Sequence, residues 1–200
     1  MNTESGAPAR TRPHAYVMRH IKVRHGAAQA LVAYGMYPLM QRLYWMDTWM
    51  LREHPEVTEG KRTEFSARFM DLRDKLKIAQ NELAERARDN GADENKWQTM
   101  EAKEEMDVEL RSPLAAGYLA CITEFDKLLS MFEALLEDGV ITRRQSHSAV
   151  VVWRTEMWST SKAMQAELDE MRTQLDPLRA AREQVLQEAK LKKIKPEEVS

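Results

Sequence analysis

The sequence predicts a mainly α-helical fold: an N-terminal ribbon-helix-helix module, with one short strand per chain in a dimer, joined to an antiparallel helical body. Three observations lead to this prediction. In one short run near the N-terminus, basic and apolar side chains alternate as they do along a strand. In the later segments, apolar side chains recur at helical spacing. A lone strand also leaves backbone donors and acceptors open, so it requires a partner.

The predicted strand covers residues 19 to 24, Arg-His-Ile-Lys-Val-Arg. Because side chains alternate along a strand, one face carries three basic side chains: His20, Lys22 and Arg24. The other face carries Ile21 and Val23 together with Arg19, which we also expect among the DNA contacts. If the same strand of a second copy pairs with it, the resulting two-stranded ribbon fits the major groove of double-stranded DNA.

Two helices are expected behind this ribbon, within a module of residues 15 to 54. Residues 26 to 34 form the first, which Gly35 ends in the left-handed conformation. Pro38 begins the second, which ends at His54-Pro55. Because unpaired backbone donors gather at a helix amino end, Gln41 and Arg42 near that end are expected to contact a DNA phosphate.

Residues 60 to 176 are expected to form the helical body, with a long helix at 63 to 88. Its apolar seam repeats at steps of three and four: Phe65, Phe69, Leu72, Leu76, Ala79 and Leu83. A second strand is possible at 106 to 110, before a Ser112-Pro113 helix start. The helix that follows is expected to end at Asp138-Gly139. The acidic face of that strand leaves an alternative open, in which it pairs with residues 19 to 24 and neutralises Lys22 and Arg24.

The two ends of the chain are polar. Residues 1 to 14 lack hydrophobic periodicity and predict a flexible basic arm, whose Arg10 and Arg12 either contact DNA or form a solvated tail. Pro177 breaks or kinks the last helical region, and residues 178 to 200 form a charged C-terminal helix or tail. Positive charge gathers at the front, because residues 1 to 45 hold six Lys or Arg against one acid, Glu4.

The motifs of several enzyme and membrane classes are absent from the sequence. It has no phosphate-binding loop, no dinucleotide glycine pattern and no Glu-x-x-His pair, so we expect no enzyme, no cofactor and no metal site. No apolar run approaches the roughly 20 residues of a membrane helix. Cys121 is the lone cysteine, which suits a reducing compartment, and we expect a cytoplasmic protein.

Two blocks of sequence carry a family resemblance. The first is Ile21-Lys22-Val23-Arg24-His25 followed by Ala28-Gln29-Ala30-Leu31; the second holds Ser112-Pro113-Leu114, Tyr118, residues 125 to 129 and residues 136 to 141. In this order, over roughly residues 16 to 160, the chain resembles the AcaB-like family of integrating conjugative elements and conjugative plasmids. The resemblance implies a dimeric transcriptional regulator of conjugative-transfer genes that binds DNA through a ribbon-helix-helix, with base contacts from His20, Lys22 and Arg24.

A second class of function stays open. The acidic body favours a non-enzymatic helical interaction or assembly protein of a conjugative element, without direct DNA binding. In that case the seam at residues 65 to 83 docks a partner helix. A regulator can also use its helical body to contact a protein partner.

Overall fold

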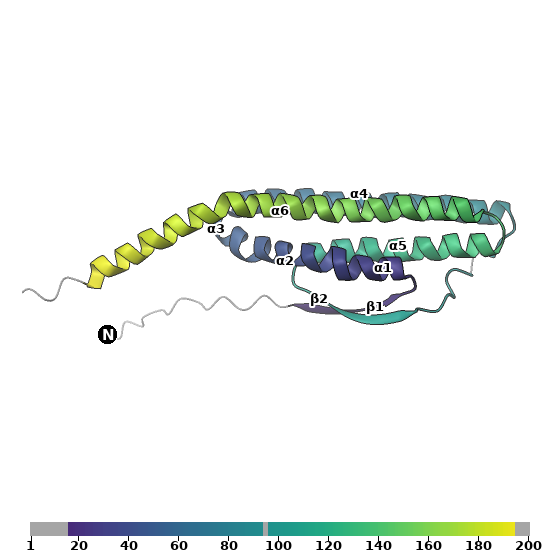
Figure 1. Cartoon of the computed structure of the whole chain (residues 1–200), viewed down its shortest axis with the longest axis horizontal. Coiled ribbons are helices and arrows are strands. Elements are labelled where there is room, and N and C mark those ends of the chain that lie inside the picture. Colours follow the sequence, from purple (N-terminus) through teal and green to yellow (C-terminus); the bar gives the residue numbers. More distant parts are fainter. Residues whose placement is uncertain (1–15, 94–95, 195–200) are drawn as a thin grey trace, which may run out of the picture.

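The computed structural model describes residues 16 to 93 and 96 to 194, which form mainly helices and one two-stranded antiparallel sheet. Three long helices run side by side: α4 (Pro55–Asp89), α5 (Pro113–Glu137) and α6 (Arg143–Ile194). Figure 1 shows three layers, with the sheet at the bottom, α1, α2 and α5 in the middle, and α4 with α6 at the top. The mainly helical prediction is confirmed.

The predicted strand forms, but its partner lies in the same chain. β1 (Val17–Val23) pairs antiparallel with β2 (Glu104–Leu110), in a register that sets Val17 opposite Leu110 and Val23 opposite Glu104. The expected ribbon between two copies is therefore wrong for this edge of β1, and the internal pairing is confirmed. The reason is that the two patterns are complementary: apolar residues share the inner face, and acids stand opposite basic residues.

Residues 26 to 53 form one continuous helical run, where we expected two helices. It comprises α1 (Gly26–Ala30), the π-helical segment η1 (Leu31–Met36), α2 (Tyr37–Trp45), a second π-helical segment η2 (Met46–Met50) and α3 (Leu51–Glu53). The backbone is right-handed helical where η1 meets α1 and α2. The predicted end at Gly35 and the predicted start at Pro38 are thus both wrong.

Gly35 serves close helix packing instead of a turn. A Cβ at this position would lie 3.4 Å from the Tyr118 hydroxyl. The carbonyl oxygen of Gly35 accepts a hydrogen bond of 2.9 Å from Ser161 Oγ on α6. Because a π-helical segment displaces the regular hydrogen-bond ladder, it leaves such a carbonyl available to a neighbouring helix.

α5 is the central helix of the core. Its ends match the prediction, since Ser112 Oγ accepts a hydrogen bond from the Leu114 N–H at 3.2 Å and Gly139 beyond the helix has φ of 72°. Side chains on several of its faces are buried, among them Tyr118, Ile122, Phe125, Leu128 and Leu135. Cys121 on this helix is buried, and burial raises the pKa of its thiol to about 12.

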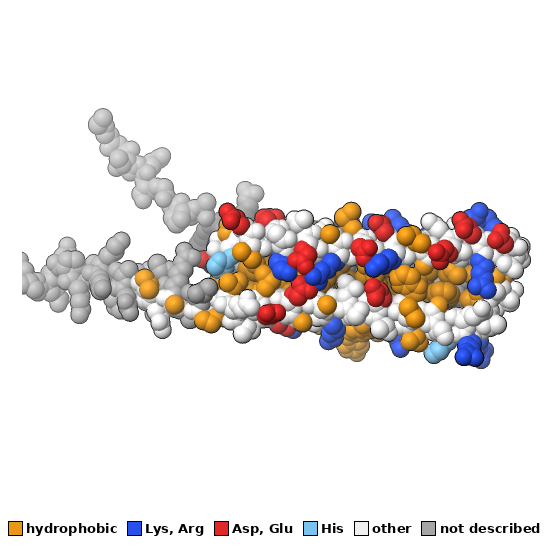
Figure 2. Space-filling view, turned by 90° about the horizontal axis from the view of Figure 1, so that it is seen from above, with side chains coloured by type: hydrophobic (Ala, Val, Ile, Leu, Met, Phe, Trp, Pro, Cys, Tyr) orange, Lys and Arg blue, Asp and Glu red, His pale blue; other side chains and the backbone are white. Residues whose placement is uncertain are grey.

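α4 meets α5 through the predicted seam, in which the four side chains from Phe65 to Leu76 are buried. Its polar face contacts α6, because Lys61 and Arg68 both form ion pairs with Glu167 on that helix. Seen from above, basic and acidic side chains meet along the line between α4 and α6, with hydrophobic side chains visible between them (Figure 2). α6 continues through Pro177 and bends in its C-terminal part (Figure 1).

Replacing the buried ring of Phe125 should destabilise the whole fold. Phe125 is fully buried, so Phe125→Ala leaves a cavity and should lower the free energy of unfolding by about 3 to 5 kcal/mol. Urea denaturation followed by circular dichroism measures this change. Val152→Ala is the control, because that side chain is 65% exposed and its loss should change stability by less than about 0.5 kcal/mol.

Candidate nucleic-acid interface

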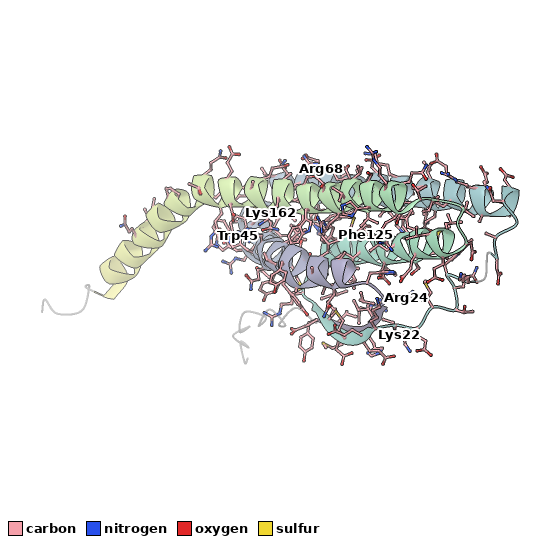
Figure 3. The ribbon with its side chains drawn as sticks, turned by 45° about the vertical axis from the view of Figure 1, so that its right-hand side comes forward. Lys22, Arg24, Trp45, Arg68, Phe125 and Lys162 are labelled. Atoms are coloured by element: carbon pink, nitrogen blue, oxygen red, sulfur yellow. The ribbon has the colours of Figure 1, made fainter. Side chains whose placement is uncertain are left out.

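The outer face of the sheet is the surface for which the sequence predicted DNA contacts. Met18, His20 and Lys22 alternate along β1 on the side away from the helices. The inner side holds Arg19 and the buried Val23. Figure 3 shows Lys22 at the sheet, with Arg24 nearer to the helices. Two of the three predicted base-reading side chains, His20 and Lys22, therefore lie on one exposed face.

Carboxylates of β2 pair with both of these side chains. Lys22 Nζ lies 2.7 Å from Glu105 Oε1, and the ring of His20 lies 3.0 Å from Asp107 and 3.3 Å from Glu105. The hydrogen bond to Asp107 is the largest cause that raises the pKa of His20, and the ion pair with Lys22 lowers the pKa of Glu105. The basic row of β1 is thus largely neutralised within one chain.

Arg24 does not lie on the outer face, because β1 ends at Val23 and the alternation stops there. Its Nε donates to the carbonyl oxygen of Met100 at 2.9 Å. The backbone N–H groups of Arg24 and His25 both donate to the buried carboxylate of Asp126, at 3.1 Å and 3.0 Å. This arrangement fastens the end of β1 to α5, and it gives Arg24 a structural role.

The predicted phosphate site at Gln41 and Arg42 does not form as expected. Because the helical run is continuous through Pro38, no helix amino end is present there. Arg42 instead forms two hydrogen bonds of 2.8 Å with Asp169 on α6, and this pairing lowers the pKa of Asp169. Gln41 is exposed beside Arg42, on the side of α2 that faces α6.

The remaining predicted contacts are separated from this face. Arg10 and Arg12 lie outside the described residues. Arg19 lines a cavity on the inner side of the sheet, together with Arg62 and Arg111. Sequence reasoning missed Arg62 and Arg111, because they come from α4 and from the end of β2 and no local pattern connects them with Arg19.

One edge of β1 has no strand beside it among the residues that the structure describes. The start of this strand is also exposed, with 62% of Tyr16, 49% of Val17 and 52% of Met18 accessible. An exposed strand edge presents unpaired N–H and C=O groups, to which another strand can add. β1 can therefore accept a further strand while it stays paired with β2.

Within the described ranges, no group of three or more His, Cys, Asp or Glu side chains is placed to hold a metal ion. None of the described helices is both long enough and apolar enough to cross a membrane.

The pairing of His20 with the carboxylates of β2 leads to a prediction about the pKa of its ring. We expect His20 to titrate with a pKa above 6.5 in the folded protein, because its hydrogen bonds favour the charged ring. Since the folded pKa is raised, the pairing stabilises the fold at low pH, and this contribution is lost as the pH rises through the folded pKa. NMR titration of the imidazole nitrogens measures the midpoint.

Asp107→Asn removes the largest cause of the shift and should lower that midpoint. Asp74→Asn, which removes an exposed carboxylate on α4, should leave it unchanged. A midpoint at or below 6.5 in the unaltered protein would contradict the described pairing.

Comparisons with known proteins bear on the fold. No protein-family model matches the chain, and no curated protein sequence matches it. Among solved structures, the chain is similar to the crystal structure of selenomethionine-containing AcaB from uropathogenic E. coli. The TM-score is 0.73 at 18% sequence identity, and the match covers 82% of this chain and 84% of that chain. At this level of identity the likeness concerns the fold, which is AcaB-like.

Proposed function

We propose that the protein is a dimeric, DNA-binding transcriptional regulator whose two copies join through the free edges of β1. The observation that carries this proposal is the exposed edge of β1 beside a helical layer. A second copy of β1 can add there in antiparallel fashion, which gives a four-stranded sheet with both β1 strands in the centre. The AcaB-like fold and the family resemblance of the sequence support the same function.

Pairing through this edge rearranges the charges of the outer face. The two central strands bring the His20 and Lys22 side chains of both copies together, and the carboxylates of Glu105 and Asp107 flank them on the outer strands. The major groove is about 12 Å wide and admits two strands, so in this proposal only the central pair enters it and the two outer strands stay at its rims. Lys22 can then donate to guanine, and protonated His20 adds positive charge.

The flanking carboxylates oppose DNA binding, because they approach the phosphates on either side of the groove. Basic residues of the sequence just before β1, Arg10 and Arg12, offset this repulsion in the proposal. Binding should therefore be weakened by salt, and it should depend on the balance of charges at the sheet. In this proposal the regulated genes are those of conjugative transfer, and the protein acts in the cytoplasm without an enzymatic activity.

A second candidate is a helical interaction or assembly protein that does not bind DNA. The observation in its favour is the neutralisation of Lys22 by Glu105, at 2.7 Å within one chain. Under this alternative the outer face is an ordinary paired surface, and the helical body carries the function. The DNA-binding proposal has the broader support, because the alternative leaves the exposed edge of β1 unexplained.

Lys22→Ala tests the proposed base contact. It should weaken binding to duplexes recovered by genome-wide capture with the intact protein by about 5-fold to 150-fold, the loss of one good base contact. Fluorescence anisotropy measures the affinity, and light scattering should give twice the chain mass of 23.2 kDa for both proteins.

Lys162→Ala is the matched control, because this lysine is equally an exposed cation but lies on α6 (Figure 3). It should bind DNA as the unaltered protein does. Equal affinity of the Lys22 and Lys162 variants would remove the site assignment, and a monomer that binds no captured duplex favours the interaction protein.

Glu105→Gln tests the charge balance of the outer sheet face by removing a negative charge, so its expected effect on DNA affinity is opposite to that of Lys22→Ala. It removes a carboxylate from the flank of the proposed interface and releases Lys22 from its ion pair, so DNA affinity should rise several-fold at low salt. The gain should shrink as the salt concentration rises. Glu101→Gln, an equal charge change at an exposed position before β2, should give a smaller gain.

A further inference from the structure

A cavity of about 330 Å³ lies where the start of β1 and the end of β2 meet the helices. Its apolar wall includes Val17, Leu51, Leu110 and Pro113. This volume falls in the range of small-molecule sites, which combine an apolar lining with a few polar groups. The cavity is separate from the outer face of the sheet, because Val17 and Arg19 lie on the inner side of the alternation.

Three arginines, Arg19, Arg62 and Arg111, line the same cavity. Asp47 is the one acidic residue of the lining, and its charge is already balanced. Arg62 Nε lies 3.3 Å from Asp47 Oδ1, and Ser112 Oγ donates to Asp47 Oδ2 at 2.6 Å. The lining therefore carries an excess of positive charge.

The three guanidinium groups differ in how far they are neutralised. Arg62 also pairs with Glu59 at 2.9 Å, and Arg111 pairs with Glu109 at 2.9 Å. Among the residues that the structure describes, the side chain of Arg19 makes no hydrogen bond or ion pair. A guanidinium is always charged and binds carboxylate or phosphate oxygens in bidentate fashion, so Arg19 is the group best placed to bind an anion.

The amino end of α5 adds to the positive field of the cavity. Ser112 and Pro113, the first residues at this end, both line the cavity, and the helix behind them has 25 residues. A helix amino end carries a partial positive charge. The field of the helix and the arginines from β1, from α4 and from the position after β2 thus converge on one half-enclosed apolar space.

We propose that this cavity binds a small organic anion with an apolar body and one carboxylate or phosphate group. The apolar body packs against Leu51, Leu110 and Pro113, and the anionic group pairs with the guanidinium of Arg19. This site is independent of the proposed DNA contacts, since it uses the other face of β1.

Binding of two matched anions tests the proposal. Phenyl phosphate and benzoate serve as probes, with benzamidine as a cation of similar shape. Ligand-observed NMR at low salt should give dissociation constants on the order of 1 mM or lower for at least one anion, as expected for ligands of about ten heavy atoms. Benzamidine should bind at least tenfold more weakly.

Arg19→Ala should weaken binding of that anion at least tenfold, and Arg19→Lys should restore part of the affinity. Arg154→Ala is the matched control, because it removes an exposed arginine from α6, away from the cavity, and should leave the affinity unchanged. Circular dichroism verifies that each variant is folded. Equal affinity of the Arg19→Ala and Arg154→Ala variants, or no binding of either anion at 10 mM (about tenfold above the expected constant), would overturn the proposal.

Discussion

The pairing of β1 with β2 is the interaction on which the rest of the structure depends. It joins two segments that are far apart in the sequence and closes the lower layer of the molecule. Val23 and Val108 of this sheet belong to the hydrophobic core, and Asp126 of α5 holds the backbone at the end of β1. The pairing decides which side chains of β1 face solvent, and among the described residues no strand lies along the other edge of β1.

This pairing also explains why a basic stretch of sequence does not make a basic surface. Three carboxylates of β2, on Glu105, Asp107 and Glu109, stand opposite the outer row of β1, which has Lys22 as its permanent cation. In the proposed dimer, a second copy at the free edge of β1 changes the balance of charges on the outer face, because it places two basic rows side by side. The pairing of β1 with β2 stays the same. The proposed function therefore depends on assembly as much as on the residues themselves.

The parts of the fold that the sequence predicts well are those set by neighbouring residues. The seam of α4, the Ser112 cap and the end at Gly139 follow from local spacing and local backbone preference. Gly35 packs against Tyr118 of α5 and Ser161 of α6, whereas its local sequence, a glycine before Pro38, indicates a helix end. The partner of β1 and the cavity at Arg19 depend on contacts between distant segments, which no local pattern reveals.

Amide hydrogen exchange along β1 tests the central claim most directly. In a strand paired on one edge, alternate amides point away from the partner strand and exchange with solvent, whereas a strand paired on both edges protects them all. We predict that the amides of β1 that point away from β2 become protected as the protein concentration rises into the range where light scattering detects dimers. Free exchange of every second amide of β1 at the highest concentration would contradict assembly through this edge.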